Sequence, residues 1–420
     1  MARHFPRGRA AALAAWAAAC GVALSAARAE DWPVFRGPRQ NDTSAETGLL
    51  LDWPQKGPPV VWTKRLGPSY SPPVVARGKV MAFHRLGDEE VIECLDAGTG
   101  RSLWEFRYPT RFVDRYEYNG GPRSSPAIDG DYVYTYGAEG MLTCLELATG
   151  RKVWQRPLNK ELNVPQGFFG VGIPPTVEKD LILLNAGGPD GAGLVGISKQ
   201  TGQTAWKTGA CGASYSAPVV ASLGGRRLAV FFTKEGLVVA APETGKVLYE
   251  FGLRSPFYES VNAASPVVVD DVIFLSASYY VGSVALRVTP GGLECVWRDK
   301  NNMQNHWATS VYHNGFLYGT HGRHEPEAVM RCLEWRTGAV RWTSPRGLGR
   351  TPFIMAQGYF IILSERGDLA LVEANPDRYV EKARVRVLDA PCWAPPVLAD
   401  GRLYVRNETL LVCLDLRGGQ

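Results

Sequence analysis

The stretch ECLDAGTGRSLWEF, from Glu93 to Phe106, decides the fold because the chain repeats it. TCLELATGRKVWQR spans Thr143 to Arg156, and RCLEWRTGAVRWTS spans Arg331 to Ser344. Each copy places an alternating apolar run before a Thr-Gly turn and a second apolar run that contains Trp after it. Two such runs around a Gly turn predict a β-hairpin. A hairpin that returns along one chain indicates a repeat architecture.

The repeat is longer than the quoted phrase, because each unit opens on a small residue followed by Pro. The opening position is held in order by Pro73, Pro126, Pro175, Pro218, Pro266, Ser310, Pro352 and Pro396. The eight positions recur about every 46 residues, which is the length of a four-stranded propeller blade. The large residue on the last predicted strand is Trp104, Trp154, Trp206, Tyr249, Trp297 or Trp342, and the seventh unit, EANPDRYVEKARVRV, has no Trp. An aromatic side chain of this size is expected to cover the contact between neighbouring blades.

The two ends of the repeat region complete one unit between them. The last unit stops at LVCLDLRGGQ, directly after its turn, and lacks a fourth strand. The first unit is preceded by VVWTKRLGPSYSPPVV, which begins with a fourth strand that has no unit ahead of it. We therefore predict an all-β, eight-bladed propeller of four-stranded antiparallel blades over residues 60–420, closed by an N-terminal strand that completes the last blade. A closed ring leaves no open sheet edge. Residues 30–59 are predicted to form an extended leader segment.

Residues 1–29 have the features of an export signal. Arg3, Arg7 and Arg9 precede an Ala-rich apolar stretch, and a small-x-small cleavage site ends at Ala29. These features predict a signal peptide that is removed on export. Lipidation at Cys20 is the alternative, and no other segment has the length and hydropathy of a membrane span. Removing the four arginines of this region lowers the formal charge from +5 to +1, which does not favour nucleic-acid binding.

The seven cysteines outside the signal predict neither zinc nor disulfides. No CxxC pair or His-spaced pair is present, so a zinc site is not indicated. Four of the cysteines hold one slot of the repeat, namely Cys94, Cys144, Cys332 and Cys413. Equivalent slots in different blades lie too far apart to bridge. Buried free thiols are the expectation.

These repeats resemble the PQQ-like repeat family of eight-bladed β-propellers, whose hallmark is an A-x-D-x-x-T-G-x-x-x-W phrase. The resemblance covers about Asp31 to Leu416. DWPVFRGPRQNDTSAETGLLLDWP before the first unit and CWAPPVLADGRLYVRN in the last unit resemble secreted bacterial PQQ-binding-like propeller proteins. The repeat specifies a fold that several functions share.

Two branches of that family imply two functions. Quinoprotein alcohol dehydrogenases hold pyrroloquinoline quinone (PQQ) and calcium, use an Asp base and carry a vicinal Cys-Cys pair. This chain has no adjacent cysteines, and the calcium-binding and catalytic residues match no positions here. No cofactor is assigned on this basis. The other branch is BamB-like, non-catalytic, and works by presenting loops to a protein partner.

Aligning the units on their prolines predicts a ring of side chains around the channel mouth. Three residues before the proline position stand Tyr70, Arg123, Gly172, Tyr215, Ala263, Trp307, Gly349 and Trp393. Four aromatic residues and one Arg among small residues suit a stacking platform for a planar or sugar-like ligand. Asn305 and His306 precede Trp307 in a polar loop and complete the predicted binding site. The alternative is that these rings are wedges packed between blades.

Two other segments have residue types found in binding sites. GTHGRHEPEA, from Gly319 to Ala328, contains His321, His324 and two Glu residues and has metal-ligand types. We predict instead a solvated hairpin on the side away from the mouth. The Gly-rich AGGPDGAG joins strand to strand, so no helix N-terminus follows it to bind phosphate. No Ser-His-Asp arrangement and no glycosidase-type carboxylate pair can be assigned.

The sequence thus predicts an exported, periplasmic or secreted, non-catalytic propeller. It is expected to bind a protein, a glycan or a small-molecule ligand through its channel-mouth loops. The alternative function is that of a PQQ-dependent or other quinoprotein-like oxidoreductase.

Overall fold

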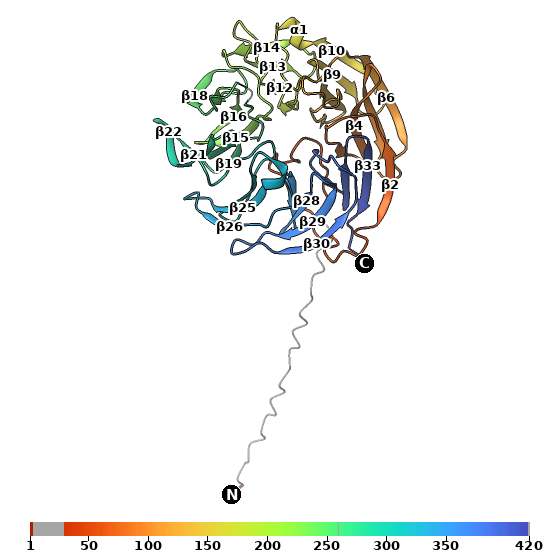
Figure 1. The fold of residues 1–420 in the computed structure, drawn as a ribbon, viewed down its shortest axis with the longest axis vertical. Coiled ribbons are helices and arrows are strands. Elements are labelled where there is room, and N and C mark those ends of the chain that lie inside the picture. The colour runs from red at the N-terminus through yellow and green to blue at the C-terminus, as the bar shows by residue number, and fades with distance from the viewer. Residues whose placement is uncertain (3–28, 259, 419–420) are drawn as a thin grey trace.

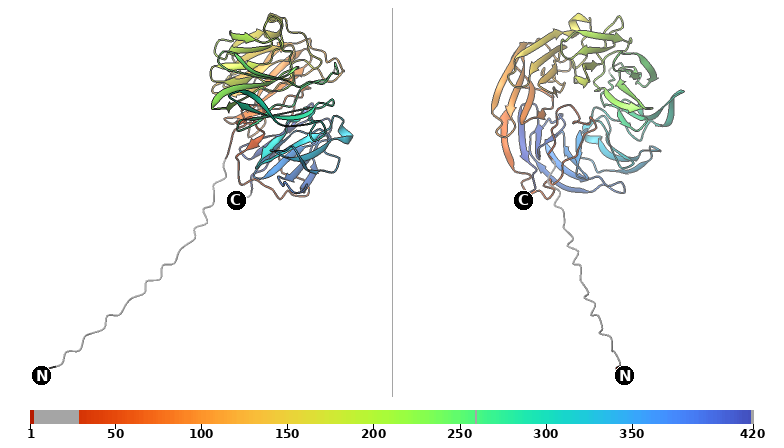
Figure 2. Two further views of the ribbon diagram at one scale, coloured as in Figure 1. Left: turned by 90° about the vertical axis from the view of Figure 1, so that its left-hand side faces the viewer. Right: turned by 180° about the vertical axis from the view of Figure 1, so that it is seen from behind.

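The chain forms a ring of eight antiparallel sheets, as the repeat predicts (Figure 1). The computed structural model describes residues 1–2, 29–258 and 260–418. Residues 3–28 of the predicted signal peptide (residues 1–29), including Cys20, lie outside the described residues. No helix in the described part of the chain has the length and hydropathy needed to cross a membrane. Seen from the side, the ring is a thick disc whose sheets stand side by side (Figure 2).

Each blade contributes four strands, which we number from the channel outward. Blades 1 to 4 contain β3 (Val74–Ala76), β4 (Lys79–Leu86), β5 (Glu89–Asp96), β6 (Ser102–Pro109); β7 (Ala127–Asp129), β8 (Tyr132–Tyr136), β9 (Met141–Glu146), β10 (Lys152–Pro157); β11 (Thr176–Glu178), β12 (Leu181–Leu184), β13 (Leu194–Ser198), β14 (Thr204–Thr208); and β15 (Val219–Leu223), β16 (Arg226–Phe232), β17 (Gly236–Ala240), β18 (Val247–Gly252). A short helix, α1 (Leu158–Glu161), follows β10.

The second half of the ring repeats this plan. Blades 5 to 8 contain β19 (Val267–Val269), β20 (Val272–Ala277), β21 (Gly282–Thr289), β22 (Gly292–Asp299); β23 (Val311–His313), β24 (Phe316–His321), β25 (Val329–Glu334), β26 (Val340–Thr343); β27 (Phe353–Ala356), β28 (Tyr359–Leu363), β29 (Asp368–Glu373), β30 (Glu381–Arg386); and β31 (Val397–Ala399), β32 (Arg402–Arg406), β33 (Leu410–Asp415), β2 (Val60–Arg65). A 3-10 turn, η1 (Glu325–Glu327), lies between β24 and β25. The leader adds β1 (Thr43–Ser44).

In most blades, a Trp on the outer strand packs against the next blade. A one-residue bulge interrupts the pairing of the third and outer strands just before Trp104 and Trp154, and a bulge re-aims the side chain that follows it. The Trp104 indole donates to the main-chain oxygen of Leu147 at 3.1 Å. Its ring covers the turn glycine of the neighbouring blade, Gly150, whose φ is +73°. The same pairing joins Trp62 to Gly100, Trp154 to Gly202, Trp206 to Gly245 and Trp297 to Gly338.

The predicted closure is confirmed. β2 pairs antiparallel with β33, from Val60 opposite Leu414 to Arg65 opposite Leu410. Trp62 on β2 donates to the main-chain oxygen of Ala97 in blade 1 at 3.0 Å. The last blade is therefore built from both ends of the repeat region, and Trp62 contacts the first blade as Trp104 contacts the second.

The seam after blade 7 is closed differently, since its outer strand has Ala383 at the Trp position. The leader takes over this role. A Cβ built on Gly57 would stand 2.7 Å from a methyl carbon of Val385 on β30. Leu51 and Trp53 of the leader pack against the same apolar cluster as Ala383. The departure of the seventh unit from the repeat is thus compensated by chain that precedes the first unit.

The start of the leader fills the channel and is here called the plug (residues 32–44). Trp32 exchanges backbone hydrogen bonds with Val75 at 2.8 and 2.9 Å, and β1 pairs with β27. Between them, the buried Arg36 binds Asp42 at 2.6 Å and donates to the main-chain oxygen of Pro266 in blade 5 at 3.1 Å. The plug therefore ties blades 1, 5 and 7 together from inside the channel.

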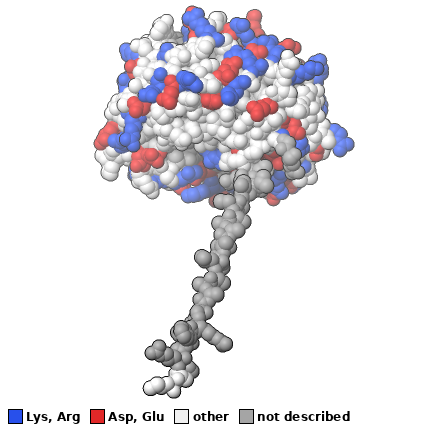
Figure 3. Space-filling model, turned by 90° about the horizontal axis from the view of Figure 1, so that it is seen from below, with Lys and Arg blue, Asp and Glu red and all other residues white. Residues whose placement is uncertain are grey.

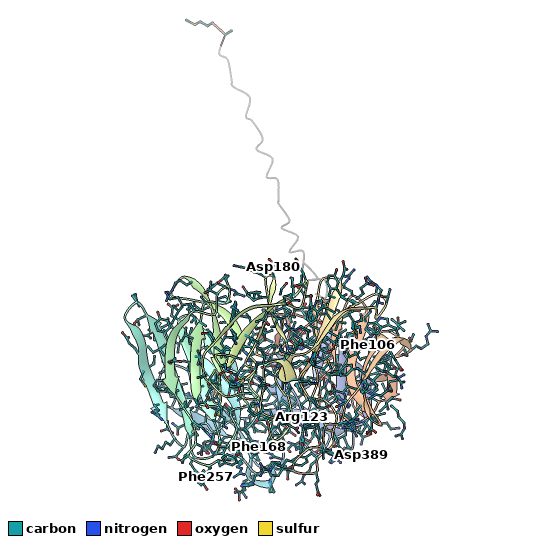
Figure 4. All side chains as sticks on the ribbon, turned by 90° about the horizontal axis from the view of Figure 1, so that it is seen from above. Phe106, Arg123, Phe168, Asp180, Phe257 and Asp389 are labelled. Atoms are coloured by element: carbon teal, nitrogen blue, oxygen red, sulfur yellow. The ribbon has the colours of Figure 1, made fainter. Side chains whose placement is uncertain are left out.

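The two faces of the ring carry different loops. Connectors between blades and hairpins between second and third strands meet at one face, because strands alternate in direction. Figure 4 shows Arg123, Phe168, Phe257 and Asp389 toward this face and Asp180 at the opposite one. We call the first the mouth face. The chain just before the plug lies at the opposite face, where the Asp31 carboxylate accepts from the Arg77 backbone amide.

The alternation of strand direction corrects the predicted position of the Gly319–Ala328 hairpin. The Gly319–Ala328 hairpin joins second and third strands and lies on the mouth side, since Gly322 N donates to Gln304 O at 3.1 Å. The prediction that it faces away from the mouth is wrong. Side chains of both charges alternate on the rim of the ring in Figure 3, and no single-sign region dominates that view.

Candidate binding face at the channel mouth

Three of the predicted mouth residues meet above the channel. The Tyr70 and Trp393 ring centroids are 4.6 Å apart, and those of Trp307 and Trp393 are 5.8 Å apart. They come from three different connectors, which the ring brings together. Tyr70 is buried, whereas Trp307 and Trp393 are half-buried. The rings therefore pack against one another across the mouth and keep part of their surface open to solvent.

An ion pair fixes the two Trp rings. The Trp393 indole donates to Glu365 Oε2 at 2.8 Å. Arg350 binds both carboxylate oxygens of Glu365 at 2.9 and 2.7 Å, and its guanidinium carbon lies 4.4 Å from the centre of the Trp307 ring. Such stacking holds a cation by the negative face of the ring. Sequence reasoning missed Arg350 and Glu365, because neither occupies the aligned position.

His306 is held in its neutral form beside these rings. Its Nε2 lies 3.2 Å from the Tyr279 hydroxyl. Burial, with the positive charges of Arg350 and Arg323 adding to it, lowers the pKa of His306 to about 3. Nδ1 of His306 and Nε1 of Trp307 are buried without a hydrogen-bond partner among the described residues. Two polar ring atoms are thus left under the mouth surface.

Asn305 supports its connector from below. It is buried, its amide nitrogen donates to Thr320 O at 2.9 Å, and its oxygen accepts from the Ser310 hydroxyl at 3.0 Å. Ser310, the residue in proline's place, therefore holds Asn305. The structure places Asn305 beneath the mouth and does not present its amide at the surface.

Arg123 is anchored by charge and by aromatic faces. It binds Asp114 at 2.5 Å, and its guanidinium carbon lies 5.2 Å from the centre of the Tyr70 ring. The Tyr70 hydroxyl donates to Glu408 Oε1 at 2.6 Å, and the Asn119 amide donates to the same oxygen at 2.7 Å. Burial, then the bond to Glu408, raises the pKa of Tyr70. This side of the mouth is therefore a rigid network.

Tyr215 stands apart from this group and reaches it through other rings. Its hydroxyl accepts from Phe169 N at 3.0 Å, and burial raises the pKa of Tyr215 to about 12. Phe169 lies 5.5 Å from Tyr215 and 6.2 Å from Tyr118, and Tyr118 lies 5.2 Å from Trp393. We call this chain of rings the aromatic belt. Its members are Tyr70, Tyr118, Phe169, Tyr215, Trp307 and Trp393.

Exposed aromatic side chains of the mouth loops form what we call the aromatic patch, which shares Tyr118 with the belt. Its members are Tyr116, Tyr118, Phe257, Tyr258 and Tyr280, with exposed fractions of 39, 47, 54, 68 and 77%. Phe168 links Tyr116 to Tyr258, with centroid distances of 6.0 and 5.8 Å, and Phe257 lies 6.0 Å from Tyr280. The patch residues come from connectors between blades and from one hairpin. In the sequence, the feature that could have revealed the patch is the aromatic content of these long loops.

Three carboxylates beside the mouth rings are already bound by protein groups. Asp114 is paired with Arg123, Glu365 with Arg350, and Glu408 with two donors. In the Gly319–Ala328 hairpin, Glu325 pairs with Arg366 at 2.9 Å. Within the described ranges, no group of three His, Cys, Asp or Glu residues has the geometry of a metal site.

Of the two histidines in this hairpin, His321 is a structural residue. The His321 Nδ1 atom accepts from Gln304 N at 3.2 Å and lies 3.2 Å from an Arg331 nitrogen. Burial, with Arg331 adding to it, lowers the pKa of His321 to about 4. The cysteines of the repeat slot are buried and unbridged, as predicted.

Comparison with known proteins supports the fold and the family. A family model described as outer membrane protein assembly factor BamB matches residues 87–344. BamB from Moraxella catarrhalis is similar with a TM-score of 0.63 and 14% identity, over 85% of this chain and 99% of that one. Quinohemoprotein alcohol dehydrogenase from Comamonas testosteroni is similar with a TM-score of 0.66 and 12% identity, over 93% of this chain and 81% of that one. No curated protein sequence matches the chain.

Proposed function

The chain belongs to the family described as outer membrane protein assembly factor BamB, and from that membership and the mouth geometry we propose that it binds a partner protein through its mouth face without catalysing a reaction. The family description names an assembly factor, a class of protein that works through other proteins. The predicted export signal would deliver this chain to the periplasm or beyond. The proposed partner is therefore a protein of the cell envelope.

The aromatic patch is the observation that carries this proposal. Soluble proteins rarely expose connected apolar surface, and such surface marks interaction sites. Tyr and Phe bury a large area at a low cost in side-chain entropy, and aromatic residues are enriched at the centre of protein interfaces. Phe257, Tyr258 and Tyr280 are more than half exposed. A partner that covered them would remove this apolar area from water.

The aromatic belt supports this proposal because ion pairs already hold it in one conformation in the free protein. Arg123 and Arg350 are each held by a carboxylate at 2.7 Å or less. A surface that is ordered in the free protein loses little conformational freedom on binding. The mouth therefore suits a pre-formed contact, with the patch as the part that meets the partner.

Site-directed photocrosslinking tests this proposal. A photoreactive amino acid replaces Phe257 or Tyr280 in turn, and the full chain is irradiated in cells of the producing organism. We expect the same crosslinked protein from both positions. The control is Asp180, which lies at the opposite face in Figure 4. Equal crosslinking from Asp180, or none from the patch, would reject the mouth as the binding face.

A PQQ-dependent oxidoreductase is the alternative, favoured by the structural similarity to a quinohemoprotein alcohol dehydrogenase. The mouth residues do not fit PQQ with calcium, because calcium requires several free oxygen ligands. Asp114, Glu365 and Glu408 already accept bonds from protein donors, so calcium would have to displace them. Incubation with PQQ and calcium, followed by an alcohol and an electron-accepting dye, is expected to give no dye reduction above background.

A further inference from the structure

A cavity of about 500 Å³ lies between blades 2 and 3, beside the aromatic belt. Its walls come from α1, from the connector that follows it, and from the strand ends of both blades. Binding pockets for small molecules typically enclose ~300–1,000 Å³. Tyr215, a member of the aromatic belt, also lines the cavity. The cavity therefore opens near the mouth. We call it the amide pocket.

Side-chain amides dominate the polar part of its lining. Asn159, Asn163, Gln166 and Asn185 all line it. Each amide carries two N–H donors and one acceptor oxygen. Asn185 is occupied, since its nitrogen donates to Gly193 O at 2.9 Å and its oxygen accepts from Ser214 N at 3.0 Å. The other three supply the groups that a ligand can use.

Asn159 is held in one orientation with its donors free. The Tyr136 hydroxyl donates to its Oδ1, its backbone nitrogen donates to Gly140 O at 3.3 Å, and its backbone oxygen accepts from Val164 N at 2.8 Å. The amide nitrogen of Asn159 has no hydrogen-bond partner within the described ranges. A locked side chain with two unused donors in a cavity wall is a pre-organised binding group.

The charge in the pocket is balanced. Glu139 and Lys160 are the charged residues that line it. Glu139 already accepts from the Thr110 hydroxyl and from Arg111 N, both at 2.7 Å. One acid and one base favour neither an anion nor a cation. The remaining wall is apolar, with Val164, Val171 and Ile173 among the amides.

We propose that the amide pocket binds a saccharide of one or two sugar rings. Vicinal hydroxyls donate and accept at once, as amides do, so each hydroxyl can satisfy an amide donor and an amide acceptor. The C–H faces of a sugar ring suit the apolar wall. The Asn159 amide, fixed by Tyr136, donates to a ring hydroxyl, and Gln166 completes the contact from the connector. This site is independent of the protein-binding function proposed for the mouth.

A saccharide array tests the proposal. The full chain is applied to printed mono- and disaccharides, and the affinity of each bound sugar is measured by titration calorimetry. We expect saturable binding to at least one sugar. Asn159→Asp keeps an oxygen for the Tyr136 hydroxyl and removes both donors, so we expect at least tenfold weaker binding at an unchanged melting temperature. Gln166→Ala changes an exposed residue and is expected to weaken binding several-fold.

Asn301→Ala is the matched control, because Asn301 is an exposed amide on another connector, and its affinity is expected to equal the parent's. The bound sugar is then compared free and attached to a carrier protein. Binding of both identifies a free saccharide as sufficient, and binding of the conjugate alone identifies a protein-linked glycan as the source. The proposal is overturned if no sugar binds the parent, or if Asn159→Asp and Gln166→Ala both bind as the parent does. Because neither residue belongs to the aromatic patch, loss of photocrosslinking at Phe257 leaves this result unaffected.

Discussion

The indole of Trp104 lies against Gly150 of the next blade so closely that a Cβ on this glycine would stand 2.4 Å from the ring. The glycine is needed twice, for its positive φ of 73° and for the space the ring occupies. This contact explains why the Thr-Gly turn and the Trp recur together. The Trp of one repeat packs against the Thr-Gly turn of the next repeat.

Gly150→Ala is expected to destabilise the protein by about 2–4 kcal/mol, combining a strained backbone with an overpacked contact. Gly130→Ala separates the two effects, because Gly130 has a φ of +56° and open space around it. We expect Gly130→Ala to lower the free energy of unfolding by at least about 1 kcal/mol less than Gly150→Ala does. Chemical denaturation measures both. Equal losses would show that the Trp contact contributes nothing.

Trp62→Ala removes the ring that joins the N-terminal strand to blade 1. We expect a loss of about 3–5 kcal/mol, the usual range for a buried aromatic side chain. Val61→Ala is the control on the same strand, since Val61 is exposed, and its effect is expected to stay within about 0.5 kcal/mol. Thermal melts of both variants give the comparison. A Trp62→Ala protein as stable as the parent would contradict closure through β2.

Arg36→Met leaves the Asp42 carboxylate of the plug without its partner. Removing one member of a buried ion pair typically costs about 3–5 kcal/mol, so we expect a marked fall in melting temperature. Arg39→Ala breaks the more exposed pair with Glu30, and such pairs contribute about 1 kcal/mol or less. If the two variants melted alike, the plug would not stabilise the ring.

The lowered pKa of the buried His306 predicts that the folded protein loses stability in acid. Its pKa is about 3 in the folded protein and 6.5 in its ordinary state, so the unfolded chain takes up a proton first as pH falls. Stability is complete above pH 6.5 and is lost progressively toward pH 3. At pH 5 the loss is about 2 kcal/mol, from ~1.4 kcal/mol per pH unit.

His306→Gln should remove this part of the pH dependence, and denaturation curves at pH 5 and pH 8 measure it. His324→Gln changes an exposed histidine of the neighbouring hairpin and should keep the parent's dependence. A His306→Gln protein with the same difference between the two pH values would contradict a neutral, buried His306.

Tyr118→Ala should weaken partner binding without loss of fold. Tyr118 is half exposed and rests edge-on against Trp393, and a central aromatic residue contributes roughly 2 kcal/mol or more to an interface. Trp393→Ala also removes the donor to Glu365, so it should lower both binding and melting temperature. Affinity for the crosslinked partner and thermal melts separate the two. Unchanged affinity in both variants would place the interface elsewhere.

Much of the mouth could not be predicted from the repeat alignment. The alignment found Trp307 and Trp393, because both stand at a fixed distance from the inner-strand proline position. It could not find Glu365, which comes from a hairpin inside blade 7 and meets Trp393 only when the connector folds over it. The polar loop before Trp307 also suggested Asn305, whose amide the fold turns inward to Thr320. Whether the aligned rings bind a ligand stays a prediction.

The sequence by itself determined the blades, their number and the closure. These follow from local patterns, since a Thr-Gly turn and an alternating run fold into a hairpin wherever they stand. Only the tertiary structure decided what fills the channel and what meets at the mouth. Arg36 reaches the oxygen of Pro266, and the Tyr70 hydroxyl reaches Glu408 across 338 positions of the chain. Contacts at such separations leave no periodic trace in a sequence, because they exist only after the ring has closed.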